Sequence, residues 1–182
     1  MTKKEKFTIT TFWILFSRSY DAYCTFQLTP DLSKESNPLV TVLGVTWTPL
    51  LLTVSILTIY ALYAYYLATF KPKDLLPKEK GFTFSNIIAY TYLGQKGEWT
   101  SVFYKVPKEL SRFNQYMGQN LTKYLVFAGF VSTTMWLLIN NTDFYTNIHS
   151  VTLIYSILII GCGIITYKWS KQQYKLYLTG QE

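Results

Sequence analysis

Charged residues are scarce in this chain of 182 residues: Asp, Glu, Lys and Arg make up 15% of it, against about 25% in a typical soluble protein. The shortage is local, because most of the charges gather between long apolar runs. Together with 49% hydrophobic and 18% aromatic residues, the low charge and the long apolar runs indicate a small protein that crosses a membrane several times.

Histidine and cysteine are also rare, which excludes several kinds of site. His149 is the single histidine, so a histidine-ligated metal cluster is impossible within this chain. The sequence has no C-x-x-C, G-x-S-x-G or glycine-rich phosphate-binding motif. Cys24 and Cys162 fall in different apolar segments at different depths, so a disulfide between them is not expected. We therefore predict neither a metal ion nor a cofactor.

Four apolar segments approach the roughly 20 residues that a helix needs to cross hydrocarbon. They predict membrane spans over residues 7–28, 46–70, 124–140 and 150–168, with an aromatic-rich connection over 71–123. Four spans leave no room for a second globular domain of ordinary size. The sequence thus predicts an all-α membrane protein that forms a single transmembrane domain, 1–182.

Lysine and arginine lie on alternate connections of this arrangement. Three lysines precede the first span, nine basic residues occupy the 71–123 connection and three lysines follow the fourth span, whereas the other two connections carry only Lys34. By the positive-inside rule, both termini and the 71–123 connection are predicted to be cytoplasmic. The first span is predicted to be a retained helix rather than a signal peptide, because Arg18 and Asp21 occupy the region where cleavage needs small neutral residues.

The net charge of +7 raises the alternative of a nucleic-acid-binding protein. The placement of the charge favours the lipid bilayer instead, because basic cytoplasmic segments attract anionic lipid headgroups. The expected partners are therefore lipids, together with a protein partner or a second copy of the chain, and not nucleic acid. The abundance of Lys, Asn, Tyr and Ile is compatible with a bacterial inner membrane.

The first span carries two charges, Arg18 and Asp21, three residues apart. Each costs about 2.5 to 3.5 kcal/mol near the bilayer centre, whereas each Leu, Ile or Phe returns only about 0.3 to 0.6 kcal/mol, so the span is marginal alone. Helical phase groups Arg18, Asp21 and Thr25 on one polar face and predicts an ion pair that faces the second span. The other face is predicted to contact lipid through Ile9, Phe12, Trp13, Phe16, Tyr20 and Tyr23.

The join between the first two spans is short and rich in turn formers. Asn37 is predicted to cap a helix that begins at Pro38. Residues 39–70 would make one helix of about 48 Å, which is longer than a bilayer core. Either Pro49 kinks that helix, or residues 39–45 form a separate re-entrant or interfacial turn. A stripe of small and hydroxyl residues predicts close antiparallel packing on the first span: Thr41, Gly44, Thr48, Leu51, Ser55, Thr58 and Leu62.

The 71–123 connection contains too many aromatic residues for a disordered linker. Apolar residues recur at helical spacing over 84–92 and 99–106, and Pro107 is predicted to open a third short helix that ends near Met117. Short amphipathic helices in the cytoplasmic headgroup region are the favoured interpretation. A small folded cap, or a docking surface for another protein, is the alternative.

The last two spans carry little chemistry. Their small residues are interpreted as helix contacts: Gly129, Ser132, Thr133, Thr134 and the Gly-Cys-Gly run at 161–163. The polar residues between them are interpreted as caps of the helix ends: Asn140, Asn141, Asp143 and His149. An enzyme would require four groups near the outer face to converge: Asp31, Glu35, Asp143 and His149.

Asp21-x-x-x-Thr25 is followed by Glu35-x-Asn37-Pro38, with the first pair in one span and the second motif at the start of the next. This arrangement resembles small multi-pass prokaryotic membrane proteins that are grouped as a domain of unknown function. The resemblance covers only this stretch of the chain. It implies a membrane protein and draws attention to these polar residues without supplying a mechanism.

Three classes of function fit these features. A non-catalytic accessory or scaffold subunit of a membrane complex is favoured, because catalytic motifs are missing and only one span carries charge. A small transporter or channel that uses the Arg18 and Asp21 stripe is the alternative, since charges inside a membrane often mark substrate pathways. A membrane-embedded enzyme with polar residues at its outer face is the second alternative.

Reporter fusions can test the predicted topology. Fusions after Lys34, Lys96, Asn141 and Glu182 should report outside, inside, outside and inside, because the basic connections stay in the cytoplasm. An external signal after Lys96 would overturn the arrangement.

Overall fold

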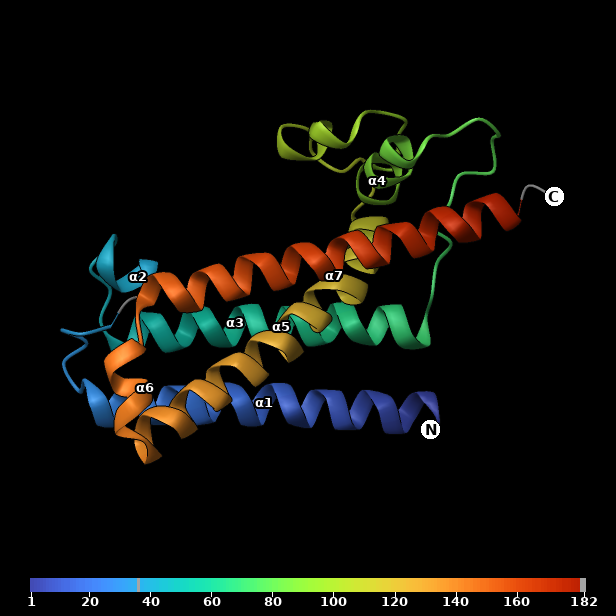
Figure 1. Cartoon of the computed structure of the whole chain (residues 1–182). Helices are drawn as coiled ribbons and strands as arrows, with labels where there is room; N and C mark the ends of the chain where they lie inside the picture. The colour runs from blue at the N-terminus through green and yellow to red at the C-terminus, as the bar shows by residue number, and fades with distance from the viewer. Residues whose placement is uncertain (36, 181–182) are drawn as a thin grey trace. The chain divides into compact units, whose positions relative to one another are not determined.

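The structure of the protein, a computed structural model, describes residues 1–35 and 37–180, and the side chains of residues 38, 146 and 147 lie outside this description. Within the described residues, all regular secondary structure is helical, as predicted. The elements, drawn in Figure 1, are α1 (Lys3–Leu28), α2 (Pro38–Thr41), α3 (Trp47–Phe70), α4 (Phe84–Leu93), the 3₁₀ helix η1 (Trp99–Phe103), α5 (Leu110–Asn141), α6 (Asp143–Ile148) and α7 (Val151–Thr179).

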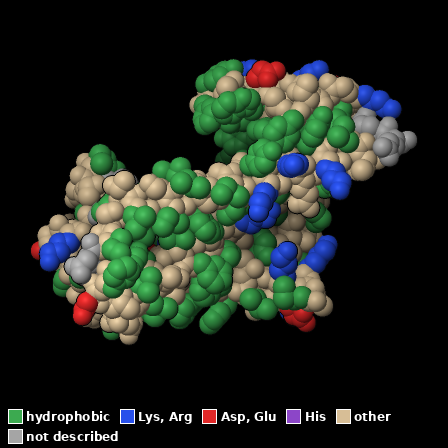
Figure 2. Space-filling model, viewed as in Figure 1, with side chains coloured by type: hydrophobic (Ala, Val, Ile, Leu, Met, Phe, Trp, Pro, Cys, Tyr) green, Lys and Arg blue, Asp and Glu red, His purple; other side chains and the backbone are tan. Residues whose placement is uncertain are grey.

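Three of these helices, α3, α5 and α7, are long and apolar enough to cross a membrane. α1 has 26 residues but is less apolar than those three, in agreement with the expected cost of Arg18 and Asp21. Large hydrophobic side chains cover much of the surface of the long helices in Figure 2, and Ile59 on α3 is 66% exposed. Such surfaces suit lipid, and they indicate a membrane protein.

The chain divides into two compact units. Unit 1 contains residues 1–60 and 125–161, and unit 2 contains residues 61–124 and the chain from Cys162 onward. α3, α5 and α7 each contribute one part to unit 1 and one part to unit 2. The candidate site described below lies entirely within unit 1.

Unit 1 contains a close contact between α1 and α5. A Cβ atom on Gly129 would lie 2.5 Å from Ser17 Oγ, so the two helices approach closely only because residue 129 is glycine. Trp13 adds to this contact: it donates its Nε1–H to the Val126 carbonyl oxygen at 3.2 Å and packs on Phe130, with ring centroids 4.3 Å apart. Gly129 is therefore a helix contact, as predicted. The prediction that Trp13 faces lipid is wrong, because its indole N–H finds an acceptor on α5.

The connection between α1 and α3 contains a separate short helix. Asn37 caps α2, because its Oδ1 accepts a hydrogen bond from the Leu39 N–H at 3.0 Å. α3 begins only at Trp47, so Pro49 lies in its first turn, where a missing N–H is tolerated. Residues 39–70 therefore do not form one long helix, and a separate turn precedes α3, as the second predicted arrangement required. Its re-entrant or interfacial position stays a prediction.

Unit 2 buries α4 against the end of α7. Ile87 is fully buried and shares a core with Phe82 and Tyr177. The Tyr177 hydroxyl group accepts a hydrogen bond from the Phe82 N–H at 3.1 Å and donates one to the Glu79 carbonyl oxygen at 2.9 Å. α4 thus occupies the predicted segment, but its apolar side chains pack on protein. The folded-cap alternative describes α4 better than an interfacial helix does.

α5 corrects the predicted extent of the central connection. The helix begins at Leu110 and runs without a break to Asn141, so the predicted separate helix that ends near Met117 is wrong. No proline interrupts the helix between Met117 and Tyr124. The single glycine of that stretch, Gly118, lies at a close packing contact with α3. The connection between α3 and α5 therefore spans 71–109 rather than the predicted 71–123.

The 161–163 run shows that small residues do not all serve as helix contacts. A Cβ atom on Gly161 would lie 2.2 Å from the Phe127 ring, so this glycine does permit a close contact. Gly163 has nothing within 4 Å of the same position, and its prediction as a helix contact is wrong. Gly163 therefore provides a matched control for glycines that are packed.

Gly118→Ala should destabilise the protein by about 1 to 3 kcal/mol, the usual range for overpacking. The added methyl group would lie 2.1 Å from the Ala64 carbonyl oxygen, which belongs to a helix backbone and cannot move aside easily. Gly163→Ala should be neutral or stabilising, because alanine favours the helix and meets no neighbour. Thermal unfolding in detergent compares the two variants, and equal midpoints would contradict the close approach at Gly118.

Candidate functional site

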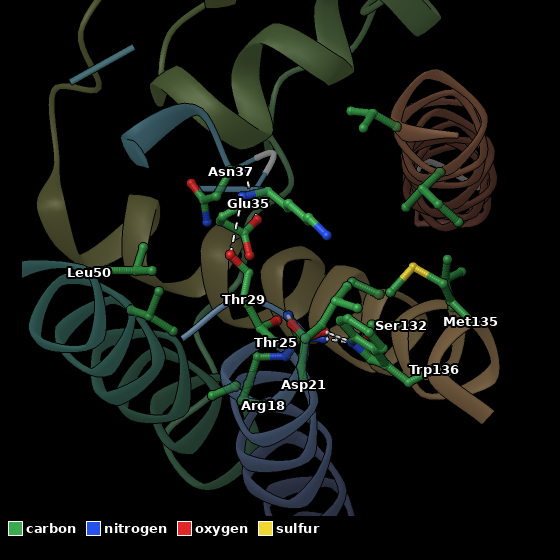
Figure 3. A pocket seen from close by; sticks show the side chains of 18 of the residues that line it. Arg18, Asp21, Thr25, Thr29, Glu35, Asn37, Leu50, Ser132, Met135 and Trp136 are labelled. Carbon is green, nitrogen blue, oxygen red and sulfur yellow. Dashed lines mark hydrogen bonds and ion pairs between the residues drawn. The ribbon is translucent and has the colours of Figure 1, made fainter. Parts of the chain in front are cut away.

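Unit 1 contains a cavity of about 320 Å³. Its lining comes from α1, the connection that follows α1, α3, α5, His149 and α7. Figure 3 shows the labelled side chains of α1, α3, α5 and the connection arranged around this space. Segments that are far apart in the sequence thus contribute to one site.

α1 supplies a polar side of the cavity because polar residues recur along one face of this helix. Arg18, Asp21, Thr25 and Thr29 follow one another at intervals of three or four residues, and all four line the cavity. A helix with 3.6 residues per turn places such residues in one row. The polar stripe predicted from the sequence is therefore one wall of the cavity.

Arg18 and Asp21 form the predicted ion pair. Arg18 Nη1 lies 3.6 Å from Asp21 Oδ2, and the two side chains are 22% and 32% exposed. Arg18 Nη2 also donates a hydrogen bond to Ser132 Oγ at 2.9 Å, and Asp21 Oδ1 accepts one from Trp136 Nε1 at 2.7 Å. Both of these partners belong to α5, so the prediction that the pair faces the second span is wrong. α3 reaches the cavity mainly with apolar side chains such as Leu50, which cannot satisfy charged groups.

Two nitrogen atoms of the lining residues remain without a hydrogen-bond partner among the described residues. They are Arg18 Nε and His149 Nδ1, and both are buried. An unpaired buried polar atom costs about 1 to 3 kcal/mol. Neither nitrogen atom is exposed to the cavity, so the two atoms do not form part of its accessible polar surface.

The connection that follows α1 is held against the cavity by local hydrogen bonds. Thr29 Oγ1 accepts a hydrogen bond from the Lys34 N–H at 3.1 Å, and Glu35 Oε1 accepts one from the Asn37 N–H at 2.8 Å. These bonds tie the backbone of the connection to side chains of the lining. Lys34, Glu35 and Asn37 all contribute to the cavity as a result.

α3 and α7 give the cavity apolar walls, with Leu50 on the first helix and Leu158 on the second. Tyr155 is the polar residue of the α7 wall, and it lies within electrostatic range of the Asp21 and Glu35 carboxyl groups. The cavity therefore combines charged groups of both signs with extensive apolar surface. Such a lining suits a molecule that has a polar and an apolar part.

The structure brings together most of the residues that the sequence singled out. Those that line the cavity are Arg18, Asp21, Thr25, Glu35 and Asn37. Pro38 begins α2, and its side chain lies outside the described part of the structure. The two motifs at 21–25 and 35–38 therefore meet at one site through their polar members.

The four groups that an enzyme would require are not all placed together. Glu35 and His149 line the cavity, whereas Asp31 and Asp143 do not belong to its lining. Asp31 Oδ1 accepts a hydrogen bond from the Ser33 N–H at 3.1 Å, which lowers the pKa of this exposed carboxyl group. His149 is the C-cap residue of α6, as predicted, in addition to its place in the cavity.

Ser132 was interpreted from the sequence only as a helix contact, and Trp136 was not singled out, so both hydrogen-bond partners of the ion pair on α5 were missed. Gly129, Ser132, Trp136 and Asn140 are spaced by three and four residues, so they share the face of α5 that packs on α1. The signal was present, because an indole N–H inside an apolar helix needs an acceptor. A search for donors at helical spacing would have identified α5 as the partner of the charged helix.

Cys24 and Cys162 are both free. Within residues 1–35 and 37–180, no group of three His, Cys, Asp or Glu side chains is placed to hold a metal ion. Comparisons of the chain with protein-family models, with curated proteins and with solved structures found no match.

A double-mutant cycle can test the ion pair. Arg18→Met and Asp21→Leu should each destabilise the protein by about 1.5 to 3 kcal/mol, the range for hydrogen bonds to charged groups, because each leaves the other charge without its partner. The double variant should cost less than the sum of the two, because no charge is left unpaired. Thermal unfolding in detergent measures all three variants. Strict additivity would mean that the two side chains do not interact.

Proposed function

We propose that the protein binds a small amphipathic molecule in the unit 1 cavity, within a membrane domain of four helices. The convergence of Arg18, Asp21 and Glu35 on one cavity with apolar walls is the observation that carries this proposal. Ionisable groups within membrane helices are costly and usually functional. Groups that served packing alone would have no need to border an open space.

The lining supports a ligand with a hydrogen-bonding polar part and a short apolar part. Arg18 and Lys34 offer positive charge, and Asp21 and Glu35 offer negative charge. At about 320 Å³ the cavity lies near the lower end of the usual range for ligand pockets, roughly 300 to 1,000 Å³, so the ligand is small.

In the proposed topology α1, α3, α5 and α7 all cross the membrane, with both termini and the 71–109 connection in the cytoplasm. The alternation of basic connections along the chain supports this arrangement. The connections that carry Glu35 and His149 then lie on the outer side, and the cavity is reached from there. A bacterial inner membrane fits the composition of the chain.

A carrier function is the second candidate. A transport pathway normally needs polar groups on several helices, whereas only one predicted span carries charge. In the structure, Ser132, Trp136 and His149 add polar groups from other segments, which weakens that objection. Transport of the bound molecule into liposomes, lost on combining Arg18→Met with Asp21→Leu, would favour a carrier. The expectation of an accessory subunit stays a prediction, and co-purification of a stable partner would support it.

Native mass spectrometry of the detergent-purified protein can test ligand binding. The wild-type protein should carry a small-molecule adduct that is released on activation and identified by its mass. Val54→Phe adds a ring to a residue of the cavity lining and should remove the adduct. Ile59→Phe is the matched control, because Ile59 is an exposed residue of the same helix, and it should retain the adduct.

Two results would contradict the proposal. One is wild-type protein that carries no adduct beyond the detergent, purified in more than one detergent. The other is an adduct that persists unchanged on a Val54→Phe variant whose thermal stability matches that of the wild type.

A further inference from the structure

Unit 2 exposes an apolar surface that is not part of the proposed ligand site in unit 1. The residues of η1 and of the chain that follows it leave large apolar side chains uncovered: Trp99, Phe103, Tyr104, Val106 and Leu110. Phe103 and Val106 are 77% and 83% exposed. We call these five residues the η1 surface, and Figure 2 shows hydrophobic side chains gathered where η1 lies in Figure 1. Contiguous exposed apolar patches mark sites of interaction.

We propose that the η1 surface inserts into the headgroup region of an anionic lipid bilayer, the same membrane that the long helices cross. Apolar and aromatic side chains would enter the boundary between headgroups and acyl chains, and neighbouring lysines would contact lipid phosphates. This assigns the interfacial role to the 99–110 segment and not to α4, which buries Ile87, Ala89 and Leu93 in the protein.

Contacts within unit 2 set the depth of this surface. The Phe84 ring packs on Tyr167 of α7, with ring centroids 6.1 Å apart. Tyr167 directly precedes Lys168, the first lysine after the apolar stretch of α7, and such a pair is typical of a membrane–water interface. Ser85, next to Phe84, accepts a hydrogen bond from the Trp99 N–H at 2.8 Å. Trp99 and η1 are therefore held at the level of an interfacial tyrosine.

η1 is also rigidly supported. Asn86 Nδ2 on α4 donates a hydrogen bond to the Gly97 carbonyl oxygen at 3.0 Å, and Ser101 Oγ donates one to the Glu98 carbonyl oxygen at 2.6 Å. Ser101 is buried, and a Cβ atom on Gly97 would lie 2.9 Å from its Oγ. The outward side chains of η1 are thus presented in a fixed arrangement, which reduces the entropy lost on insertion.

The basic residues near the η1 surface favour a bilayer that contains anionic lipids. Lys105 and Lys108 lie between residues of the η1 surface and Lys96 lies shortly before it, and residues 71–112 contain eight Lys and Arg residues against four Asp and Glu residues. Lys105 Nζ lies over the Tyr104 ring, 5.8 Å from its centre, and Lys96 Nζ lies over the Phe82 ring at 5.1 Å. The Glu98 carboxylate accepts a hydrogen bond from the Ser85 hydroxyl group at 2.6 Å, so this acidic group is engaged within the protein. An apolar segment with lysines within it and beside it complements anionic headgroups.

Site-directed spin labelling of the full chain can test the proposal. Phe103→Cys and Val106→Cys are labelled one at a time in a Cys24→Ala, Cys162→Ala background and reconstituted into vesicles of phosphatidylcholine and phosphatidylglycerol in equal parts. Both positions are exposed, so the labels should not disturb the fold. Lys78→Cys, an exposed position outside the η1 surface, is the control.

Labels at 103 and 106 should be accessible to oxygen and protected from a water-soluble nickel chelate, whereas the label at 78 should be accessible to the chelate. Changing Lys105 and Lys108 to glutamine should weaken insertion by about fivefold per lysine, the electrostatic contribution expected of a basic residue at an anionic surface. Pure phosphatidylcholine vesicles should give weaker protection from the chelate.

Full chelate access at both 103 and 106 in the anionic vesicles would overturn the proposal. Protection from oxygen as well as from the chelate would overturn it too, because it would indicate that a second copy of the chain or another protein covers the η1 surface.

Discussion

The contact between α1 and α5 is the constraint on which unit 1 depends. In the proposed topology α1 crosses the membrane, where lipid offers no hydrogen bonds, so its charges would have to be satisfied by protein, by each other or by a bound molecule. Gly129 lets the two helices approach, and this approach brings Ser132 and Trp136 within hydrogen-bond distance of Arg18 and Asp21. A helix that is marginal alone thereby acquires partners for both of its charges.

The same contact leaves the charged pair only partly satisfied. Arg18 Nε has no partner among the described residues, and both side chains remain partly exposed next to the cavity. Both side chains border a cavity that Glu35 and His149 also line, and this convergence is the basis of the proposed ligand site.

In unit 2, some aromatic residues of the central connection are buried in a core and others are exposed. Phe82 and Tyr177 are buried in a core that α4 and the end of α7 share. Arg112 strengthens this core: its guanidinium group lies 4.7 Å from the centre of the Tyr90 ring and donates a hydrogen bond to the Leu75 carbonyl oxygen at 2.7 Å. The aromatic residues of η1 face outward instead, and the proposed membrane contact accounts for that difference.

The sequence alone determined the helical class, the extents of α3 and α4 to within about a residue, the Asn37 cap and the need of α1 for a partner. Those features depend on periodicity, capping chemistry and the cost of charge, all of which act over a few neighbouring residues. The start of α5 at Leu110 lies close to the predicted opening at Pro107, whereas the predicted end near Met117 was wrong, because the helix continues through Gly118.

Only the tertiary structure decided which helix satisfies α1, because the choice depends on where a glycine permits close approach and which side chains then face the charges. It also decided that Asp21, Glu35 and His149 share one cavity, since residues more than a hundred positions apart meet through packing and not through local pattern. The division between buried α4 and exposed η1 has the same origin. Both segments show apolar periodicity, and only the presence of a packing partner on α7 separates them.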